Sequence, residues 1–236
     1  MCPFAHLIRH PSYGDVLIDS GLDASFAHAK YGNIRTPASF VLSLTYDAPY
    51  AQAPGQDIHA QLAAIAGARP VTVKKVFFTH LHMDHTAGVP SLDRGVELVI
   101  GRGEADDFAQ HFGFGQIPSD ARFVELDFRS ATHMPYIGPA IDVFGDGSLW
   151  AISTPGHSLG HMSFVVNASQ GPVLLTGDAA HFRWAFEHGA APRAPDAELA
   201  GAARESLDRL RAFAAHFPQV TVFTGHEAPA REHANL

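Results

Sequence analysis

Two patterns of hydrophobic residues along the chain predict its strands and helices. Short apolar runs rich in β-branched residues and bounded by Gly, Pro or Asp predict strands at 4–9, 16–18, 71–78, 96–100, 123–126, 141–144, 149–152, 162–167, 173–176 and 220–223. Apolar positions at helical spacing predict helices at 57–68, 104–112 and 196–217, and Asp196 caps the last of these before Pro218 stops it. Residues 130–140 follow neither pattern and are predicted to form a loop.

The stretch 31–56 interrupts both patterns. Pro37, Pro49 and Pro54 break the periodicity, although residues 40–44 are apolar. We expect a long loop with a short helix or strand. Long loops in compact domains often cover a site or bind a partner, so this one could serve as a lid or as the arm of a homodimer.

Composition narrows the class of protein. With 236 residues, 46% hydrophobic and 17% charged, the chain can bury a sizeable core in one large domain or two small ones. The net charge of −8, without a Lys/Arg cluster, argues against a nucleic-acid partner. Cys2 is the only cysteine, which excludes an internal disulfide and fits a reducing compartment. No signal peptide and no apolar run of ~20 residues is visible, so we expect a cytoplasmic protein without a membrane partner.

A dense group of metal-binding residue types follows the predicted strand 71–78. His80, His82, Asp84 and His85 fall within six positions, where the strand ends and the chain turns. Imidazole and carboxylate groups are ligands of zinc and other first-row metals. The alternative, a histidine-rich surface loop without metal, is disfavoured because similar residues follow later strands.

Three later strand ends repeat one arrangement. His157 follows Thr-Pro-Gly, Asp178 follows Thr-Gly and His226 follows Thr-Gly, and each glycine lets the backbone turn sharply. Together with the first group they make five histidines and two aspartates. One ion needs about four ligands, so seven residues suit two ions that share an aspartate.

This pattern resembles the metallo-β-lactamase superfamily over nearly the whole chain. The stretches 16–21, 154–161 and 173–179 are most similar to the N-acyl-homoserine lactone hydrolases of that superfamily. The resemblance implies a single α/β domain over 1–236, a four-layer αββα sandwich. It also implies that one metal is held by His80, His82 and His157, a second by Asp84, His85 and His226, and both by the bridging Asp178.

The implied chemistry is the hydrolysis of an ester bond. Two divalent cations, by default Zn²⁺ with Mn, Fe or Co as alternatives, would generate a bridging hydroxide that attacks a carbonyl carbon. Asp84 could carry the proton to the leaving group. The substrate implied by the resemblance is an N-acyl-homoserine lactone or a related small lactone or ester, which would make the protein a quorum-quenching lactonase.

Several residues near these ligands have two interpretations. His181 stands where the lactone hydrolases commonly have a tyrosine that contacts the substrate carbonyl, so it is predicted either to be catalytic or to support a metal ligand. Phe182, Trp184 and Phe186 could pack in the core or form a wall for an apolar acyl or aromatic group. His161 is expected to be structural, and Asp19 to form a turn or to support the site. The residues predicted at the surface are His6, His10, His28, His59, His111, His216 and His233, whereas His133 is placed in a loop that could face the site.

Other functions use a similar metal set. A thiolester hydrolase of this fold would need a helical extension beyond His226, for which ten residues leave no room. A phosphodiesterase is harder to separate, because two-metal sites also suit phosphoryl transfer. A metal-binding sensor without catalysis would leave a complete set of catalytic ligands unexplained.

Overall fold

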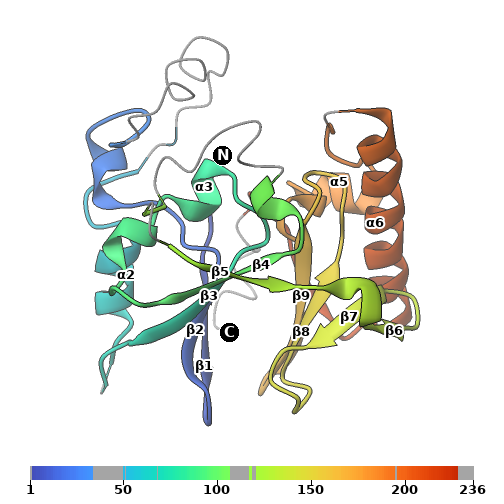
Figure 1. Cartoon of the computed structure of the whole chain (residues 1–236), viewed down its shortest axis with the longest axis horizontal. Helices are drawn as coiled ribbons and strands as arrows, with labels where there is room; N and C mark the ends of the chain where they lie inside the picture. The colour runs from blue at the N-terminus through green and yellow to red at the C-terminus, as the bar shows by residue number, and fades with distance from the viewer. Residues whose placement is uncertain are drawn as a thin grey trace. The chain divides into compact units, whose positions relative to one another are not determined.

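A computed structural model describes residues 2–33, 50, 52–67, 69–106, 117–118, 121–194 and 196–227. The chain forms two compact units, Met1–Val99 with Ala105–Val124, and Ile100–Glu104 with Glu125–Leu236. It passes between them within strands β4 (Glu97–Gly101) and β5 (Phe123–Leu126), both labelled in Figure 1. No helix among the described residues is long and apolar enough to cross a membrane.

The first unit is built on a sheet with strand order β1-β2-β3-β4-β5. Its first strands, β1 (His6–His10) and β2 (Gly14–Ile18), pair antiparallel, whereas β2, β3 (Val73–Phe77) and β4 run parallel. The helical segments are η1 (Ala24–Ala27), α2 (Ile58–Ala64), α3 (Met83–Thr86) and η2 (Val89–Ser91). Because β2 and β3 are parallel neighbours, their carboxyl ends meet at one edge, which brings Asp19 beside the segment that begins at Thr79.

The second unit carries a sheet of order β11-β10-β9-β8-β7-β6. Its strands are β6 (Thr132–Met134), β7 (Gly138–Asp142), β8 (Leu149–Ser153), β9 (Met162–Ala168), β10 (Gly171–Leu175) and β11 (Thr221–Phe223). Neighbouring strands are antiparallel except for the parallel pair β10–β11. The helical segments are η3 (Phe128–Ser130), η4 (Gly177–Ala179), α5 (Arg183–His188) and α6 (Ala197–His216).

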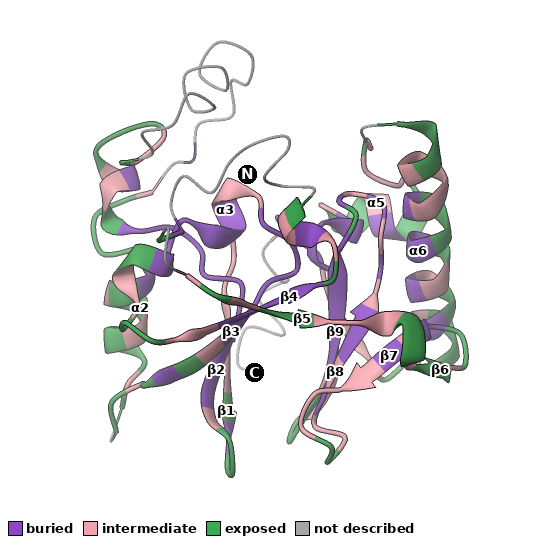
Figure 2. Cartoon of the chain, viewed as in Figure 1, coloured by how far each residue is buried: buried purple, intermediate pink, exposed green. Residues whose placement is uncertain are grey.

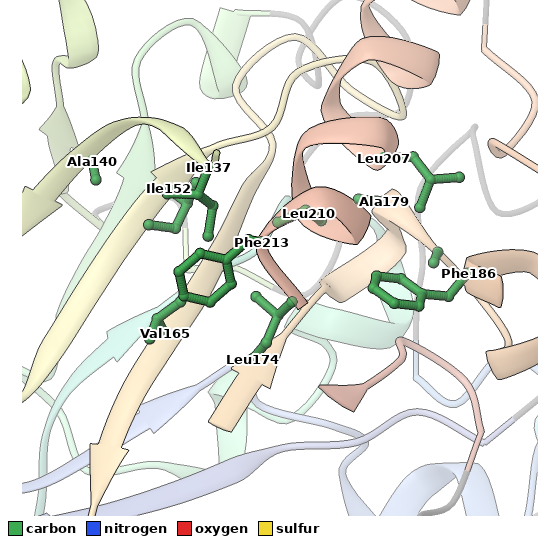
Figure 3. Packing of buried hydrophobic residues seen from close by; sticks show 11 residues of the cluster. Ile137, Ala140, Ile152, Val165, Leu174, Ala179, Phe186, Leu207, Leu210 and Phe213 are labelled. Carbon is green, nitrogen blue, oxygen red and sulfur yellow. The ribbon is translucent and has the colours of Figure 1, made fainter. Parts of the chain in front are cut away.

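Helix α6 covers one face of this sheet and closes its core. The helix begins at Asp196, whose side chain accepts a hydrogen bond from the Leu199 N–H. Leu207, Leu210 and Phe213 are buried on one side of the helix, whose outer side is exposed (Figure 2). Figure 3 shows these side chains among those of the sheet, including Ile152, Val165 and Leu174. Removing one such leucine side chain typically costs about 2–5 kcal/mol of stability.

Gly201 offers a test of helix propensity in α6. A Cβ added at this position would meet nothing within 4 Å, and the residue has no left-handed φ. Gly201→Ala should therefore raise the free energy of unfolding by about 0.5–1 kcal/mol, because alanine loses less backbone entropy in a helix. Urea denaturation followed by circular dichroism measures the change. A destabilised variant would contradict the open environment of this position.

The predicted strands agree with the structure to within about two residues in most cases, but the loop prediction for 130–140 is wrong. Residues 132–134 and 138–142 form the antiparallel pair β6–β7, and the turn between them uses Tyr136 and Gly138 at φ 67° and 91°. Pro139 was the misleading signal. It lies in β7 before the first residue that pairs with β8, so its missing N–H removes no bond of that ladder.

Other elements differ from the sequence predictions or lie outside the described residues. The helix predicted at 57–68 ends earlier, at Ala64 with Ile65 as its C-cap, and Gly67 follows at φ 60°. Helix α5 was not predicted at all. The predicted loop at 31–56 lies largely outside the described residues, as do positions 107–112 of the helix predicted at 104–112. Tyr50 is described, and it packs with Leu22 and Phe26 in a small core cluster.

Asp15 and Arg69 form an ion pair that should make stability depend on pH. The buried Asp15 carboxylate accepts two hydrogen bonds from the Arg69 guanidinium, at 2.9 and 2.7 Å, and one from the Thr72 N–H at 3.0 Å. Burial alone would raise the pKa of Asp15, but these hydrogen bonds and the Arg69 charge outweigh it and hold the pKa below its ordinary value.

A depressed carboxylate pKa stabilises the fold only where the carboxylate is ionised. Asp15→Asn should lower the free energy of unfolding by about 1–2 kcal/mol at pH 7, a modest figure because Arg69 is half-exposed to screening solvent. The difference from the wild type should persist down to about pH 4, the ordinary pKa of aspartate, and vanish as the pH falls through the lower folded value. Urea unfolding between pH 7 and pH 3 measures it. Asp208→Asn, at an exposed pair, should change little at any pH.

Candidate metal centre

The first unit gathers the four residues that follow β3. The ring of His80, which is fully buried, lies 4.4 Å from that of His82 and 4.2 Å from that of His85, measured between centroids. Asp84 and His85 lie on the short helix α3, where the Asp84 Oδ2 is 3.7 Å from the His85 Nε2. All four residues predicted from this motif therefore come together.

Asp19 orients this group from the end of β2. Its Oδ2 lies 2.8 Å from the His85 Nδ1, and its carboxylate accepts hydrogen bonds from both the N–H and the hydroxyl of Thr79. Because an ionised carboxylate only accepts, the Nδ1 of His85 carries the proton, which leaves its Nε2 as the nitrogen that could bind a metal. Asp19 also adopts φ 57°, a left-handed conformation typical of turns. The sequence analysis gave a turn and support of the site as alternatives, and Asp19 does both.

The two histidines of β1 depart from their predicted surface positions. His10 is buried, and its Nδ1 accepts hydrogen bonds from the N–H groups of Ser12 and Tyr13, which stabilises the turn between β1 and β2. His6 is half-buried near the Asp19–His85 pair. Burial lowers the pKa of His6, the Asp19 carboxylate opposes this effect, and the positive charge that His85 can carry adds to it. The sequence gives no local signal for either environment, since both depend on strand pairing.

The second unit gathers its ligand-type residues around Asp178. The Oδ2 of this buried carboxylate lies 3.1 Å from the Nε2 of His226, 3.2 Å from that of His181 and 3.4 Å from that of His157. The three residues predicted from the later strand ends therefore meet, and His181 joins them. The donor atoms of His157, Asp178 and His181 all lie within 4.8 Å of one another.

Backbone hydrogen bonds hold the turns after β10 and β11 together. The Gly225 N–H donates to the Ala180 carbonyl at 3.0 Å, and the His226 N–H donates to the His181 carbonyl at 2.9 Å. Gly225 is required at this close approach, because a Cβ there would lie 2.2 Å from the Asp178 Oδ1. The parallel pairing of β10 and β11 thus brings His226 to Asp178.

The turn that carries His157 is fixed from two sides. Helix α6 supplies the Ser206 hydroxyl, which donates to the Pro155 carbonyl at 2.8 Å. The buried carboxylate of Glu104 accepts hydrogen bonds from the Ser158 hydroxyl at 2.7 Å and from the Gly160 N–H at 3.0 Å. The sequence analysis missed Glu104, since a single acidic residue 54 positions away from Ser158 leaves no sequence pattern.

His161 holds the backbone of Asp178 through a directed chain of hydrogen bonds. The Asp178 N–H donates to the His161 Nε2 at 3.1 Å, so the proton of a neutral imidazole must lie on Nδ1. Nδ1 then donates to the Thr154 hydroxyl, which donates to the Ser163 hydroxyl, and this in turn donates to the Thr176 carbonyl. His161 is therefore structural, as predicted, with a specific task beside the site.

The aromatic residues after His181 divide between core and surface. Phe186 is buried and belongs to the core cluster beneath α6, in keeping with core packing. Phe182 and Trp184 are 44% and 63% exposed, so core packing is wrong for these two. Residues 183–188 form helix α5, in which alternate residues such as Trp184 and Phe186 do not share a face.

The donors in both units fit first-row divalent metals. Imidazole nitrogens and carboxylate oxygens are the ligands that Zn, Mn, Fe and Co share, and neither unit offers thiolates among its clustered residues. The support of His85 by Asp19 also matches metal sites, in which a carboxylate commonly orients a ligating histidine.

Comparison with known proteins defines the class. The chain matches the Metallo-beta-lactamase superfamily over residues 4–226, so it belongs to that superfamily. Among solved structures, an N-acyl homoserine lactone hydrolase with the product N-hexanoyl-L-homoserine at its catalytic metal center has a similar fold, with a TM-score of 0.71 and 21% identity over 94% of this chain and 80% of that one. A probable metal-dependent hydrolase from Staphylococcus aureus has a TM-score of 0.64 and 16% identity over 93% and 72%. The predicted α/β fold of this superfamily is thereby confirmed.

Some of the curated relatives are named as enzymes that act on lactones or lactams. The N-acyl homoserine lactonase AttM of Agrobacterium fabrum is 34% identical over 170 residues, which are 70% of this chain and 62% of the relative. The gamma-lactamase FDB1 of Fusarium pseudograminearum is 26% identical over 206 residues, 75% of this chain and 45% of the relative. The chain thus spans less than two thirds of the length of the curated relatives it matches.

Proposed function

We propose that the two clusters form one dinuclear metal site within a single metallo-β-lactamase domain. One divalent cation is held by His80, His82 and His157, the other by Asp84, His85 and His226, and Asp178 bridges the two. The support is that each unit gathers its own share of these ligands, and that the superfamily match spans both units. Zn²⁺ is the default metal, with Mn, Fe or Co as alternatives of the same ligand chemistry.

The proposed reaction is hydrolysis of a lactone. When bound, two divalent cations would lower the pKa of a water to about 7 and would polarise the substrate carbonyl. The carboxylate of Asp84, buried in the first cluster, takes up a proton and delivers it to the alkoxide that leaves when the ring C–O bond breaks. His181 is the second proposed catalytic residue, because its side chain is 28% exposed and its Nε2 faces Asp178.

The substrate class is an N-acyl-homoserine lactone or a related small lactone or ester. The observation that carries this proposal is the 34% identity to an N-acyl homoserine lactonase across 70% of the chain. The exposed rings of Phe182 and Trp184 follow His181 and offer apolar surface for an acyl or aromatic group. In a cell the activity would amount to quorum quenching, and the net charge of −8 favours such small substrates over nucleic acids. Cytoplasmic location and a homodimer stay predictions.

A substrate screen tests the proposal. Metal-loaded chain is assayed with short- and long-chain N-acyl-homoserine lactones, an aromatic lactone, a γ-lactam, a thiolester and bis-p-nitrophenyl phosphate. Cleavage of the homoserine lactones with the highest kcat/KM, abolished by chelation and restored by metal, is the expected result. Cleavage of the phosphodiester alone or of the thiolester alone would contradict the lactonase proposal and indicate phosphodiesterase or thiolesterase activity instead. Metal-loaded protein that leaves every substrate intact would favour a sensor.

A further inference from the structure

Three imidazoles surround one oxygen atom in the second unit, and the proposed function assigns only two of them to a metal. The Nε2 atoms of His226, His181 and His157 lie 3.1, 3.2 and 3.4 Å from the Asp178 Oδ2. His157 and His226 are proposed ligands of the two metals. His181 reaches the same oxygen at an intermediate distance, so its geometry does not separate it from these two.

Hydrogen bonding alone accounts poorly for this arrangement. A carboxylate oxygen accepts about two hydrogen bonds, and a neutral imidazole has only one N–H to offer. Three rings protonated on Nε2 would exceed what that oxygen can accept, and a ring protonated on Nδ1 would instead turn the lone pair of its Nε2 toward the carboxylate oxygen. A cation placed among these atoms resolves the conflict, because each Nε2 then presents a lone pair to the metal.

The spacing of the donors also fits a shared ion. With metal–nitrogen and metal–oxygen distances of about 2.0–2.2 Å, the edge between two neighbouring ligands of one ion is about 3.0–3.4 Å, from six-coordinate to tetrahedral geometry. The distances from the Asp178 Oδ2 to the His157 and His181 Nε2 atoms, 3.4 and 3.2 Å, match this edge. The ring centroids of His157 and His181 are 5.3 Å apart and nearly perpendicular, so the two rings do not stack against each other.

The backbone holds His181 in this position. It follows η4, and its carbonyl accepts the His226 N–H at 2.9 Å, which ties the residue to the turn that carries another proposed ligand. The Phe182 ring lies against the His181 ring, with centroids 6.2 Å apart. These contacts hold the residue in place beside Asp178, as a ligand has to be held if it is to keep its orientation.

We propose that His181 is itself a metal ligand, and that with His157 and Asp178 it holds one divalent cation. The inference rests on the metal site of the proposed function but not on its lactone substrate. If His80 and His82 bind the same ion, five protein ligands surround it. Tetrahedral zinc would then have no position left for water, whereas a six-coordinate ion keeps one. The site would favour Mn, Fe or Co over Zn.

Cobalt binding to residue 181 can be observed directly. In a Cys2→Ser background, His181→Cys replaces the imidazole by a thiolate on the same residue. Loading this variant with Co²⁺ should produce a sulfur-to-cobalt charge-transfer band in the near ultraviolet, and the Cys2→Ser protein alone should show none. A folded His181→Cys variant that binds Co²⁺ without this band would overturn the proposal.

Affinity measurements provide the second test. Metal-free His181→Phe should bind Co²⁺ at least about 10–100-fold more weakly than the wild type in competition with a chromophoric chelator, since even indirect supports of a metal ligand cost that much. The control is His188→Phe, which changes an exposed histidine of α5 whose Nδ1 donates a hydrogen bond to the Trp184 carbonyl at 2.8 Å. It should bind Co²⁺ like the wild type.

The outcomes separate this inference from the proposed function. Wild-type protein that binds no metal would contradict both the proposed function and metal ligation by His181. Wild-type protein that binds two equivalents, together with an His181→Phe variant of equal affinity and an unchanged Co²⁺ spectrum, would leave the proposed function standing. It would then overturn metal ligation by His181, which would act on the substrate instead, and the loss would appear in kcat/KM alone.

Discussion

Asp178→Ala is expected to lose metal and nearly all hydrolytic activity while keeping the fold. Asp178 is the residue around which the three imidazoles of the second unit gather, so its loss removes the proposed bridge between two ions. Metal ions contribute several kcal/mol of transition-state stabilisation. At 1.36 kcal/mol per factor of ten, kcat/KM should fall on the order of 10³-fold or more.

Metal content and kcat/KM for a homoserine lactone measure this effect, with circular dichroism to confirm the fold. Asp208→Ala is the matched control. It removes the same side chain from the surface of α6, where the carboxylate is 69% exposed and pairs with Arg211 at 3.5 Å. This control should keep two metal equivalents and full activity. If the Asp178→Ala protein also kept two equivalents, Asp178 would not be the bridging ligand.

Gly225→Ala should damage the metal site with a single added methyl group. The new Cβ would lie 2.2 Å from the Asp178 Oδ1 and 2.9 Å from the Gly177 carbonyl oxygen, so the carboxylate has to move. We expect metal affinity to drop about 10–100-fold, the range found when the support of a ligand is removed. Overpacking of this kind should also cost about 1–3 kcal/mol of stability.

A chelator competition assay and urea denaturation measure the two effects of Gly225→Ala. Gly201→Ala makes the same chemical change in α6, where nothing lies within 4 Å of the added Cβ, and it should leave metal affinity unchanged. Equal metal affinity in the two glycine variants would mean that the turn at Gly225 yields without disturbing Asp178.

The residues that the sequence analysis placed in the site share one property, which is a position just past a predicted strand. Parallel neighbours bring such positions together, so His80 and Asp178 could be assigned without knowing the register of any sheet. Glu104 and the hydrogen-bonding role of His161 could not be predicted, because each depends on which residues face one another across distant segments. The same limit applies to the buried surroundings of His10.

Errors in secondary structure arose where local signals conflict with tertiary context. Pro135 and Pro139 suggested a loop, but the β6–β7 pair accommodates the second of them at a position without a partner in β8. Core packing was one interpretation of the three aromatic residues after His181, but α5 buries Phe186 and leaves Trp184 exposed. Burial by neighbouring elements decides such cases, and a local pattern of hydrophobic residues gives no information about that burial.

The chain of hydrogen bonds through His161 begins at the Asp178 N–H and ends at the Thr176 carbonyl, so it closes a ring on two residues of one turn. Thr154 and Ser163 complete the ring. Thr154 directly follows strand β8, and Ser163 lies within strand β9. The turn therefore cannot open alone, because opening it breaks bonds anchored in the sheet. Asp178 lies outside every strand, yet its amide hydrogen should exchange with solvent at the slow rate of the sheet interior rather than at the rate of a loop.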